Sequence, residues 1–530
     1  MLEHVSTARA QEGCAEGDCG ACTVAIGELV DGAVCYRAVN ACIQLLPMLE
    51  GKALVTVEAL KQPENFKAGA GAGRLHPVQQ ALVDLNGSEC GFCTPGFVMS
   101  LYAAYVGGEK PSRSKVNDLL AGNLCRCTGY GPILDAADEM YRYQRPEWDD
   151  ERRAVERRRL EQIAHNETVV ISHCCQGSDG RDSGGQSQGG QGSGGQGQAA
   201  QGPGEQSQVG QGPGDQAFYS PGNIEELARI YAAHPQATLV AGATDVGLWV
   251  TKQHRTLKTL IHIGRVKALR ELVIAGGVMR IGAGVTYSDA AAAIGKAYPD
   301  FGELLRRIGG MQIRNAGTIG GNIANGSPIG DTPPALIVLA AQLVLRHGET
   351  QRRIPLESFF IRYGDQDRQP GEFVEAVEVP LLDDPDRLRC YKISKRFDQD
   401  ISALCGCFNI HVEAGNVVDA RICYGGMAAT PLRASSVEAA LTGKPWCMQS
   451  VQKALPAFDD DYAPLSDMRA SAAYRQQAAK NLLVKYFLET GQQAVAQQAA
   501  GQQATEQQRS GPSLSQTRLV GRGAHLEAGA

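Results

Sequence analysis

The spacing of its cysteines constrains this chain more than any other feature. The chain contains sixteen cysteines, and eight of them lie in two tight groups before residue 130. The two groups read Cys14-x4-Cys19-x2-Cys22 with Cys42, and Cys90-x2-Cys93 with Cys125-x-Cys127. No charged stretch followed by an apolar stretch opens the sequence, so a secretory signal and disulfides are not expected. Closely spaced thiolates are soft metal ligands, so these residues are predicted to bind metal.

The first group has the spacing of a plant-type [2Fe–2S] site, in which C-x4-C-x2-C is followed by a distant fourth cysteine. Its loop, Gly13–Cys22, contains glycines that let the backbone wrap closely and direct N–H groups at the sulfurs. A structural zinc site is the alternative, although zinc sites usually use short C-x2-4-C pairs. We predict that the first group binds a [2Fe–2S] cluster.

The spacing of the second cysteine group does not by itself decide which metal it binds. Both of its pairs lie at an expected turn or helix start, and zinc would suit four such thiolates. The C-x-C pair is unusual for a structural zinc finger, but it can hold one edge of an iron–sulfur cluster. Spacing therefore predicts a metal site here without choosing between the two.

Composition excludes several classes of function. A chain of 530 residues is expected to form three or four domains. A formal net charge of -6 and 6% aromatic residues argue against nucleic-acid binding through a basic surface or base stacking. The longest apolar run, 335–341, is too short to cross a bilayer, so no membrane attachment is expected. We therefore expect a cytoplasmic protein.

Two low-complexity segments divide the chain. Residues 176–216 contain 15 glycines and 11 glutamines and cannot bury enough surface to fold, so they are predicted to form a flexible linker with a span of about 35 Å. Residues 491–530 repeat Gln-Gln pairs and are expected to be a disordered tail or an exposed helix. A mixed-charge helix is expected over 147–161, and we interpret it as a solvated face rather than a binding patch.

Two glycine-rich loops follow the linker. One spans Val240–Gly247 and the other spans Asn315–Asp331. Glycines after a strand let backbone N–H groups approach a pyrophosphate, and nearby hydroxyls can add hydrogen bonds. Neither loop contains G-x-G-x-x-G, so a Rossmann fold is not indicated. Taken alone, the loops fit tight turns in an α/β domain at least as well as a nucleotide site.

The cysteine motifs resemble a known family. Gly13–Cys22 with Cys42, Gly91–Gly96 and Ala121–Tyr130 together are similar to the iron–sulfur portion of the xanthine dehydrogenase and molybdenum hydroxylase family. This resemblance implies that each cysteine group binds its own [2Fe–2S] cluster, the second being closer to a molybdenum cofactor. It also implies an α+β multidomain fold.

The implied domains follow in the order of the family. Residues 1–62 would form a ferredoxin-like β-grasp [2Fe–2S] domain that is short at its N-terminus, and 74–145 a four-helix [2Fe–2S]-binding domain. Residues 146–216 would hold the charged helix and linker. An FAD-binding domain of the vanillyl-alcohol-oxidase type would span 217–382, and a C-terminal α+β flavoprotein domain 387–490, before the tail at 491–530.

The resemblance also assigns FAD-binding residues. The first loop would cradle the pyrophosphate, the second would line the ribityl chain and ribose, and two further residues would lie near the flavin ring. Lys392 could instead be a surface lysine on a strand, and Tyr363 a core tyrosine. The implied residues are Val240, Ala241, Gly242, Ala243, Thr244, Asp245, Val246, Gly247, Thr318, Gly321, Asn322, Ser327, Asp331, Tyr363 and Lys392.

The order cluster, cluster, FAD implies the small subunit of a xanthine-oxidising enzyme. Electrons from purine oxidation would pass from a molybdopterin-binding large subunit through both clusters to FAD and NAD+, with no catalytic residue for hydroxylation on this chain. The assembly would be a heterotetramer or larger. Two alternatives stay open: a subunit of a related hydroxylase for another N-heterocycle or an aldehyde, and a zinc-bearing scaffold without enzymatic activity.

Overall fold

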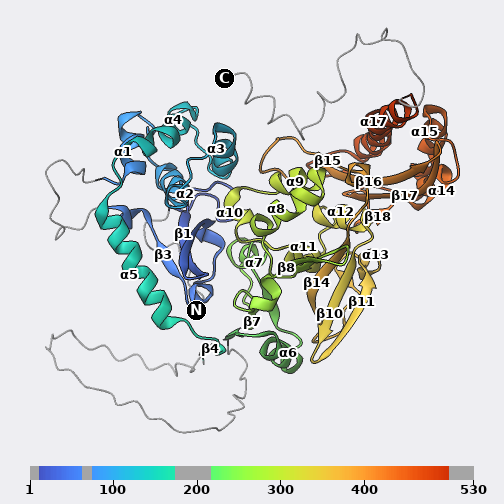
Figure 1. Cartoon of the computed structure of the whole chain (residues 1–530). Helices are drawn as coiled ribbons and strands as arrows, with labels where there is room; N and C mark the ends of the chain where they lie inside the picture. The colour runs from blue at the N-terminus through green and yellow to red at the C-terminus, as the bar shows by residue number, and fades with distance from the viewer. Residues whose placement is uncertain (1–10, 62–74, 174–215, 500–530) are drawn as a thin grey trace, which may run out of the picture.

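The computed structural model describes residues 11–61, 75–173 and 216–499. Figure 1 shows the N-terminal modules on one side, a central region built on two sheets, and a C-terminal module at the far end. The mixed helix and sheet content confirms the predicted α+β multidomain class. No helix among the described residues is long and apolar enough to cross a membrane.

The first module is a three-stranded antiparallel sheet in the order β2-β1-β3. Its strands are β1 (Thr23–Val30), β2 (Ala33–Asn40) and β3 (Ala53–Val55). The hairpin register pairs Thr23 with Asn40. Because Cys22 precedes β1 and Cys42 follows β2, this register brings two cysteines that are distant in sequence to the same end of the sheet.

The second module consists of four helices, as predicted. They are α1 (Pro77–Asp84), α2 (Thr94–Val106), α3 (Arg113–Leu120) and α4 (Gly131–Glu139). Apolar residues of α2, among them Phe97 and Leu101, share one buried core with Ala25 and Val55 of the sheet. The two modules are therefore packed against each other rather than only linked.

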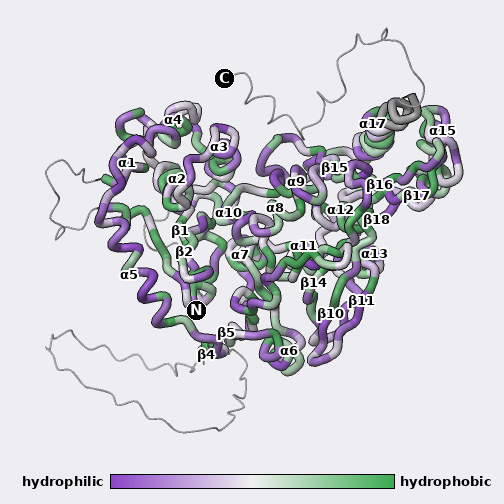
Figure 2. Tube along the Cα trace, viewed as in Figure 1, coloured by the Kyte–Doolittle hydropathy of each residue, from purple (hydrophilic) through white to green (hydrophobic). Residues whose placement is uncertain are grey.

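The mixed-charge helix α5 (Glu147–Ile163) is not simply a solvated face. Figure 2 shows it as largely hydrophilic, yet Trp148, Asp149 and Leu160 are buried. Asp149 accepts from the Tyr102 hydroxyl of α2 at 3.4 Å, and Glu156 accepts from the Tyr36 hydroxyl of β2. These carboxylates thus anchor α5 to the two N-terminal modules, which the sequence interpretation did not foresee.

The central region begins before the Gly/Gln segment. Strand β4 (Val169–His173) pairs antiparallel with β5 (Gln216–Ser220), with His173 opposite Gln216. Both strands belong to the four-stranded sheet β4-β5-β7-β6, whose other strands are β6 (Thr238–Val240) and β7 (Thr259–His262). The predicted linker therefore starts and ends within one hairpin instead of joining two separated domains. Residues 174–215 themselves lie outside the described residues.

A second sheet in the central region is antiparallel, in the order β11-β10-β14-β9-β8. Its strands are β8 (Leu272–Ala275), β9 (Val278–Gly282), β10 (Gln342–His347), β11 (Thr350–Pro355) and β14 (Phe373–Pro380). A small two-stranded ribbon is formed by β12 (Phe360–Arg362) and β13 (Asp365–Gln366). Buried residues of β9, β10 and β14 form the largest core together with the surrounding helices.

The helices of the central region connect and cover these sheets. They are α6 (Ile224–Ala233), α7 (Val246–Thr251), α8 (Tyr287–Ala297), α9 (Pro299–Arg306), α10 (Met311–Arg314), α11 (Ile319–Asn325), α12 (Thr332–Val338) and α13 (Leu356–Phe359). Figure 1 shows α10 on the side facing the N-terminal modules, next to α2.

The C-terminal module places one sheet between two cores. Its strands are β15 (Leu388–Ile393), β16 (Leu404–Glu413), β17 (Asn416–Gly425) and β18 (Leu432–Arg433), and its helices are α14 (Ser435–Leu441), α15 (Met448–Ala454), α16 (Phe458–Asp461) and α17 (Ala472–Ala499). Cys405 and Cys407 of β16 belong to the core of the central region, whereas Leu404 and Phe408 belong to that of the C-terminal helices. Helix α17 continues to Ala499, so the start of the predicted tail is helical; residues 500–530 lie outside the described residues.

The hairpin geometry makes a prediction about the Gly/Gln segment. Replacing residues 174–215 by an Asn-Gly turn should preserve the β4–β5 pairing, because two-residue turns close such hairpins. A shorter loop also costs less closure entropy, so the free energy of unfolding should stay the same or rise by up to about 3 kcal/mol. Urea unfolding measures the outcome. A lower unfolding midpoint would show that the segment packs on the protein.

A buried histidine predicts an acid-sensitive module. His76 is fully buried at the start of α1, where its Nδ1 accepts from the Val78 N–H at 3.3 Å. Burial, assisted by the charges of Arg152 and Arg145, lowers the pKa of His76 to about 3. Below pH 6.5 His76 is protonated in the unfolded chain but stays neutral in the folded chain. The free energy of unfolding therefore falls as the pH falls from 6.5 toward 3.

His76→Asn should remove this dependence while keeping a side chain that can cap the helix. Relative to the variant, the wild-type chain should lose about 1.4 kcal/mol of stability per pH unit below pH 6.5. Urea unfolding between pH 7 and 5 measures the difference. Parallel pH profiles for the two proteins would contradict the assignment.

Candidate functional site

The structure brings the first four cysteines together. The Cys14 thiol contacts those of Cys19 and Cys42, and Cys42 also contacts Cys22. Backbone N–H groups of Asp18 and Cys19 each donate to the Cys14 sulfur at 3.3 Å. The hydrogen bonds from the Cys19 and Cys42 thiols hold the pKa of Cys14 well below its usual range. Cys14 therefore favours the thiolate, the form that binds metal, whereas the same thiol contacts raise the pKa of Cys19 and Cys42.

The second four cysteines also meet, as two contacting pairs. Cys93 contacts Cys125, and Cys90 contacts Cys127. Burial and the hydrogen bond to Cys125 raise the pKa of the Cys93 thiol to about 12. Cys90 and Cys127 are exposed, in contrast to the buried Cys22 and Cys42 of the first group.

Pairs of thiols are what a [2Fe–2S] cluster requires. In such a cluster four thiolates are shared between two irons, so no iron needs three protein ligands. Among the described residues, no group of three or more His, Cys, Asp or Glu side chains meets the geometry of a metal-ion site. Both cysteine groups fit the cluster in their donor type. The second group also shows the pairwise arrangement, whereas the thiols of the first form one continuous set of contacts. The role of both groups as ligands is a proposal on that basis.

The two cysteine loops are in direct backbone contact. The Leu124 N–H donates to the carbonyl oxygen of Cys19 at 2.9 Å, one residue before Cys125. A Cβ on Gly96 would collide with the carbonyl oxygen of Gly20, and a Cβ on Gly20 would collide with that of Gly122. Glycine at these positions lets the loops approach so closely.

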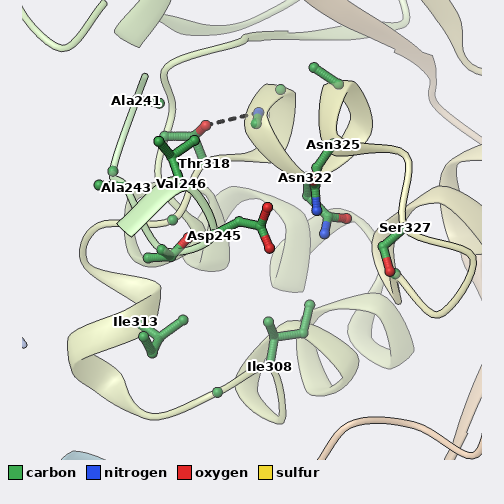
Figure 3. Close-up of a pocket in the computed structure, with 18 of the residues that line it drawn as sticks. Ala241, Ala243, Asp245, Val246, Ile308, Ile313, Thr318, Asn322, Asn325 and Ser327 are labelled. Atoms are coloured by element: carbon green, nitrogen blue, oxygen red, sulfur yellow. Dashed lines mark hydrogen bonds between the residues drawn. The ribbon is translucent and has the colours of Figure 1, made fainter. Parts of the chain in front are cut away.

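A cavity of about 720 Å³ lies in the central region, within the usual range for a cofactor site. Figure 3 shows Asp245, Thr318 and Asn322 around it, with Ile308 and Ile313 on another side. Twelve of the FAD-binding candidates line it, namely Ala241, Gly242, Ala243, Thr244, Asp245, Val246, Thr318, Gly321, Asn322, Ser327, Asp331 and Lys392.

Local backbone geometry explains how the two glycine-rich loops form this wall. Thr318 caps α11, its hydroxyl accepting from the Gly321 N–H at 3.0 Å. The first loop turns at Ala243, which has a φ of 57°, and Gly242 packs so closely on the Ala316 carbonyl that a Cβ could not fit. Each loop therefore holds the other in place beside the cavity.

A buried ion pair joins the cavity to the C-terminal module. Lys392 of β15 donates to Asp331 at 2.6 Å, and Ser402 donates to the other oxygen of the same carboxylate at 2.6 Å. The side chains of Lys392 and Asp331 are 3% and 8% exposed. Lys392 is thus a buried partner in the site, not a surface lysine.

Three candidates do not line the cavity. Val240 is buried in β6 as part of a small core. Gly247 packs against Ile43 in the first iron–sulfur module. Tyr363 is 73% exposed, because it lies at the turn between β12 and β13, where Gly364 has a φ of 71°. Tyr363 is therefore not a core tyrosine. Its place beside the flavin ring stays a prediction, because its neighbour Gly364 lines the cavity.

Sequence reasoning also missed part of the wall. The segment from Ile308 to Gly310 lines the cavity, and so do Gln399–Ser402 of the C-terminal module. Glu16, Gly17 and Asp18 of the first cysteine loop line it as well. The sequence offered no local pattern for these three segments, because they reach the cavity only through the packing of separate modules against one another. The first cysteine group and the cavity are thus immediate neighbours.

The lining suits a flavin dinucleotide. Lys392, Thr244 and Asn322 offer hydrogen-bond donors, and the Asp245 carboxylate can accept from hydroxyl groups. Burial raises the pKa of Asp245, whose carboxylate accepts from the Trp249 ring N–H at 3.1 Å. Ile308, Ile313 and other apolar residues supply the surface that an aromatic ring system needs. Residues and cavity size together fit FAD.

Three regions of the chain match protein-family models. Residues 56–138 match a [2Fe-2S] binding domain, 212–382 match the FAD binding domain in molybdopterin dehydrogenase, and 389–490 match the CO dehydrogenase flavoprotein C-terminal domain. These matches favour an iron–sulfur cluster over zinc in the helical module. Fold and sites together define an iron–sulfur flavoprotein.

Curated relatives place this flavoprotein in a family. The chain is 28% identical over 504 residues to xanthine dehydrogenase of Emericella nidulans and 30% identical over 518 residues to that of Drosophila subobscura. Both alignments cover 90% of this chain and 36% of the relative, so the chain spans about a third of the relatives' length. The chain belongs to the molybdenum hydroxylase family and corresponds to its iron–sulfur and FAD-binding portion.

Among solved structures, the chain is similar to a chain of quinoline 2-oxidoreductase from Pseudomonas putida 86. The two are 22% identical with a TM-score of 0.48, and the match covers 52% of this chain and 96% of that chain.

The buried ion pair yields a prediction. Lys392→Met leaves the Asp331 carboxylate buried without its cation, which should lower the free energy of unfolding by about 3 kcal/mol. Adding Asp331→Asn removes the uncompensated charge and keeps an acceptor for Ser402, so the double variant should regain most of that loss. Urea unfolding of both variants measures this. Equal destabilisation in the single and the double variant would contradict the pairing.

Proposed function

We propose that this chain carries electrons from a molybdenum centre on a partner through two [2Fe–2S] clusters to FAD and then to NAD+, during oxidation of hypoxanthine and xanthine to urate. The observation that carries the proposal is the position of the first cysteine loop. Residues Glu16–Asp18, which lie between Cys14 and Cys19, line the cavity that fits FAD.

This position supports a definite electron order. The first cluster would be the immediate donor to FAD, since its loop borders the cavity. The second cluster would receive electrons from outside, because Cys90 and Cys127 are exposed while the other edge of its site abuts the Cys19 loop. The cofactors supply the redox chemistry when bound, and the protein sets their order and separation.

The exposed edge of the second site supports a partner. Phe92, Leu124 and Tyr130 surround these cysteines with exposed apolar side chains, 49%, 39% and 37% accessible. A molybdopterin-binding large subunit docked there would cover them, in a heterotetramer or larger assembly. The proposed location is the cytoplasm, where thiols stay reduced.

The curated relatives support xanthine as the substrate, because they carry the name xanthine dehydrogenase. NAD+ as the acceptor is proposed from the resemblance of the cysteine motifs to the family. A second candidate function is the same relay in a hydroxylase acting on another N-heterocycle or an aldehyde. The substrate would be determined by the partner, so this chain's residues do not separate the two.

The proposal predicts that one cysteine variant loses NAD+ reduction by xanthine but keeps NADH oxidation by an artificial dye. In the complex with the large subunit, Cys93→Ser should abolish reduction of NAD+ by xanthine, because electrons from the molybdenum centre would enter this chain only through the second cluster. Oxidation of NADH by an artificial dye should continue at most of the wild-type rate, since it needs only FAD and the groups near it. Steady-state assays of both activities, with iron and flavin content, are the measurement.

Cys447→Ser, at a cysteine outside both groups, is the matched control and should keep both activities. Equal loss of the two activities in Cys93→Ser with full flavin content would contradict the electron order. Turnover of a different heterocycle or an aldehyde, without xanthine turnover, would favour the second candidate.

A further inference from the structure

The side chain of Gln312 joins three modules at a single point. It lies on α10, directly after residues 308–310, which line the flavin cavity. Figure 1 shows α10 reaching from the central region toward the iron–sulfur modules. The Gln312 side chain is 1% exposed, so its contacts are shielded from water.

Its amide nitrogen contacts an acceptor from each neighbouring element. The Nε2 atom lies 3.2 Å from Thr23 Oγ1, 3.2 Å from Ser100 Oγ and 2.8 Å from Asn123 Oδ1. Thr23 directly follows Cys22, and Asn123 lies two residues before Cys125. Ser100 is on α2, the helix that begins after Cys93. One side chain therefore contacts elements that carry both cysteine groups.

The surrounding hydrogen bonds require a donor at this position. The Thr23 hydroxyl donates to Gly20 O at 2.6 Å, and the Ser100 hydroxyl donates to Asn123 Oδ1 at 2.7 Å. The Asn123 amide donates to Gly20 O at 3.0 Å and to Thr23 Oγ1 at 3.2 Å. With these protons committed, only acceptor positions face Gln312, and its NH2 group has two protons to share among the three of them.

The rest of the Gln312 side chain fills space without making bonds. Its Oε1 atom has no hydrogen-bond partner, and a Cβ on Gly122 would collide with it. The amide is therefore held by its nitrogen and by close packing against the second cysteine loop.

Resting on the proposed function, we propose that Gln312 is a positioning residue that sets the separations between the two clusters and the flavin. Electron transfer between fixed groups falls steeply as they move apart, so displacements on the ångström scale change its rate strongly. Gln312 acts on the first loop through Thr23, on the second through Asn123, and on the cavity through its own segment.

Other contacts hold the modules together, which separates positioning from assembly. Arg37 of β2 forms a bidentate ion pair with Asp289 of α8, in which its two terminal nitrogens lie 2.5 and 3.0 Å from the carboxylate oxygens. This pair joins the same two regions but touches neither cysteine loop. Losing Gln312 should therefore loosen the alignment of the redox groups while the modules stay assembled.

Gln312→Met tests the proposal, because methionine keeps the volume and removes the donors. The full chain with its clusters and FAD is reduced by a flash-generated deazariboflavin radical, and electron transfer between flavin and clusters is followed by absorbance. We expect wild-type iron and flavin content with an electron-transfer rate about tenfold lower. Arg37→Met is the matched control and should stay within about twofold of the wild-type rate.

A wild-type rate in Gln312→Met, or the same slowing in Arg37→Met, would overturn the proposal. If Gln312→Met loses its cofactors, Gln312→Asn retains the amide but shortens its reach, and should show the slower rate at full occupancy. Loss of cofactors in both variants would mean that the residue serves stability alone, which also overturns it. Absence of iron and flavin in the wild-type chain would instead refute the proposed function.

Discussion

Close backbone contact between the two cysteine loops is the constraint on which the rest of the structure depends. Gly20, Gly96 and Gly122 meet where any larger side chain would collide, and the Leu124 N–H bonds to the Cys19 carbonyl. This contact explains why the sheet and the helical module share one core, since loops so close cannot sit on modules that move independently. It also fixes the positions of the two cysteine groups relative to each other.

The flavin cavity depends on the same packing. Its walls come from the two glycine-rich loops, from the first cysteine loop and from residues 399–402 of the C-terminal module. Among the contacts that fix these parts relative to one another are the Lys392–Asp331–Ser402 group and the hydrogen bonds of Gln312. A redox relay benefits from this design, because cofactors held by several modules keep their separations only if the modules are locked together.

The sequence predicts those parts of the fold and site that depend on local pattern. Cysteine spacing predicted both groups, and helical periodicity predicted all four helices that surround the second. What could not be predicted depends on packing between distant segments, as in the approach of Ile308 and Ser402 to the cavity. Tyr363 lies outside the cavity wall because a turn directs it outward. The Val169–His173 strand, by contrast, carried a β-branched signal beside the Gly/Gln segment that could have revealed the hairpin.

The central claim is that the two cysteine groups hold two [2Fe–2S] clusters on one chain beside a bound FAD. Iron, zinc and flavin analysis of anaerobically prepared protein, combined with EPR spectroscopy after dithionite reduction, tests it most directly. The account predicts about four irons and one flavin per chain, with two distinguishable [2Fe–2S] signals. Zinc without iron, or iron with a single cluster signal at full flavin occupancy, would contradict it.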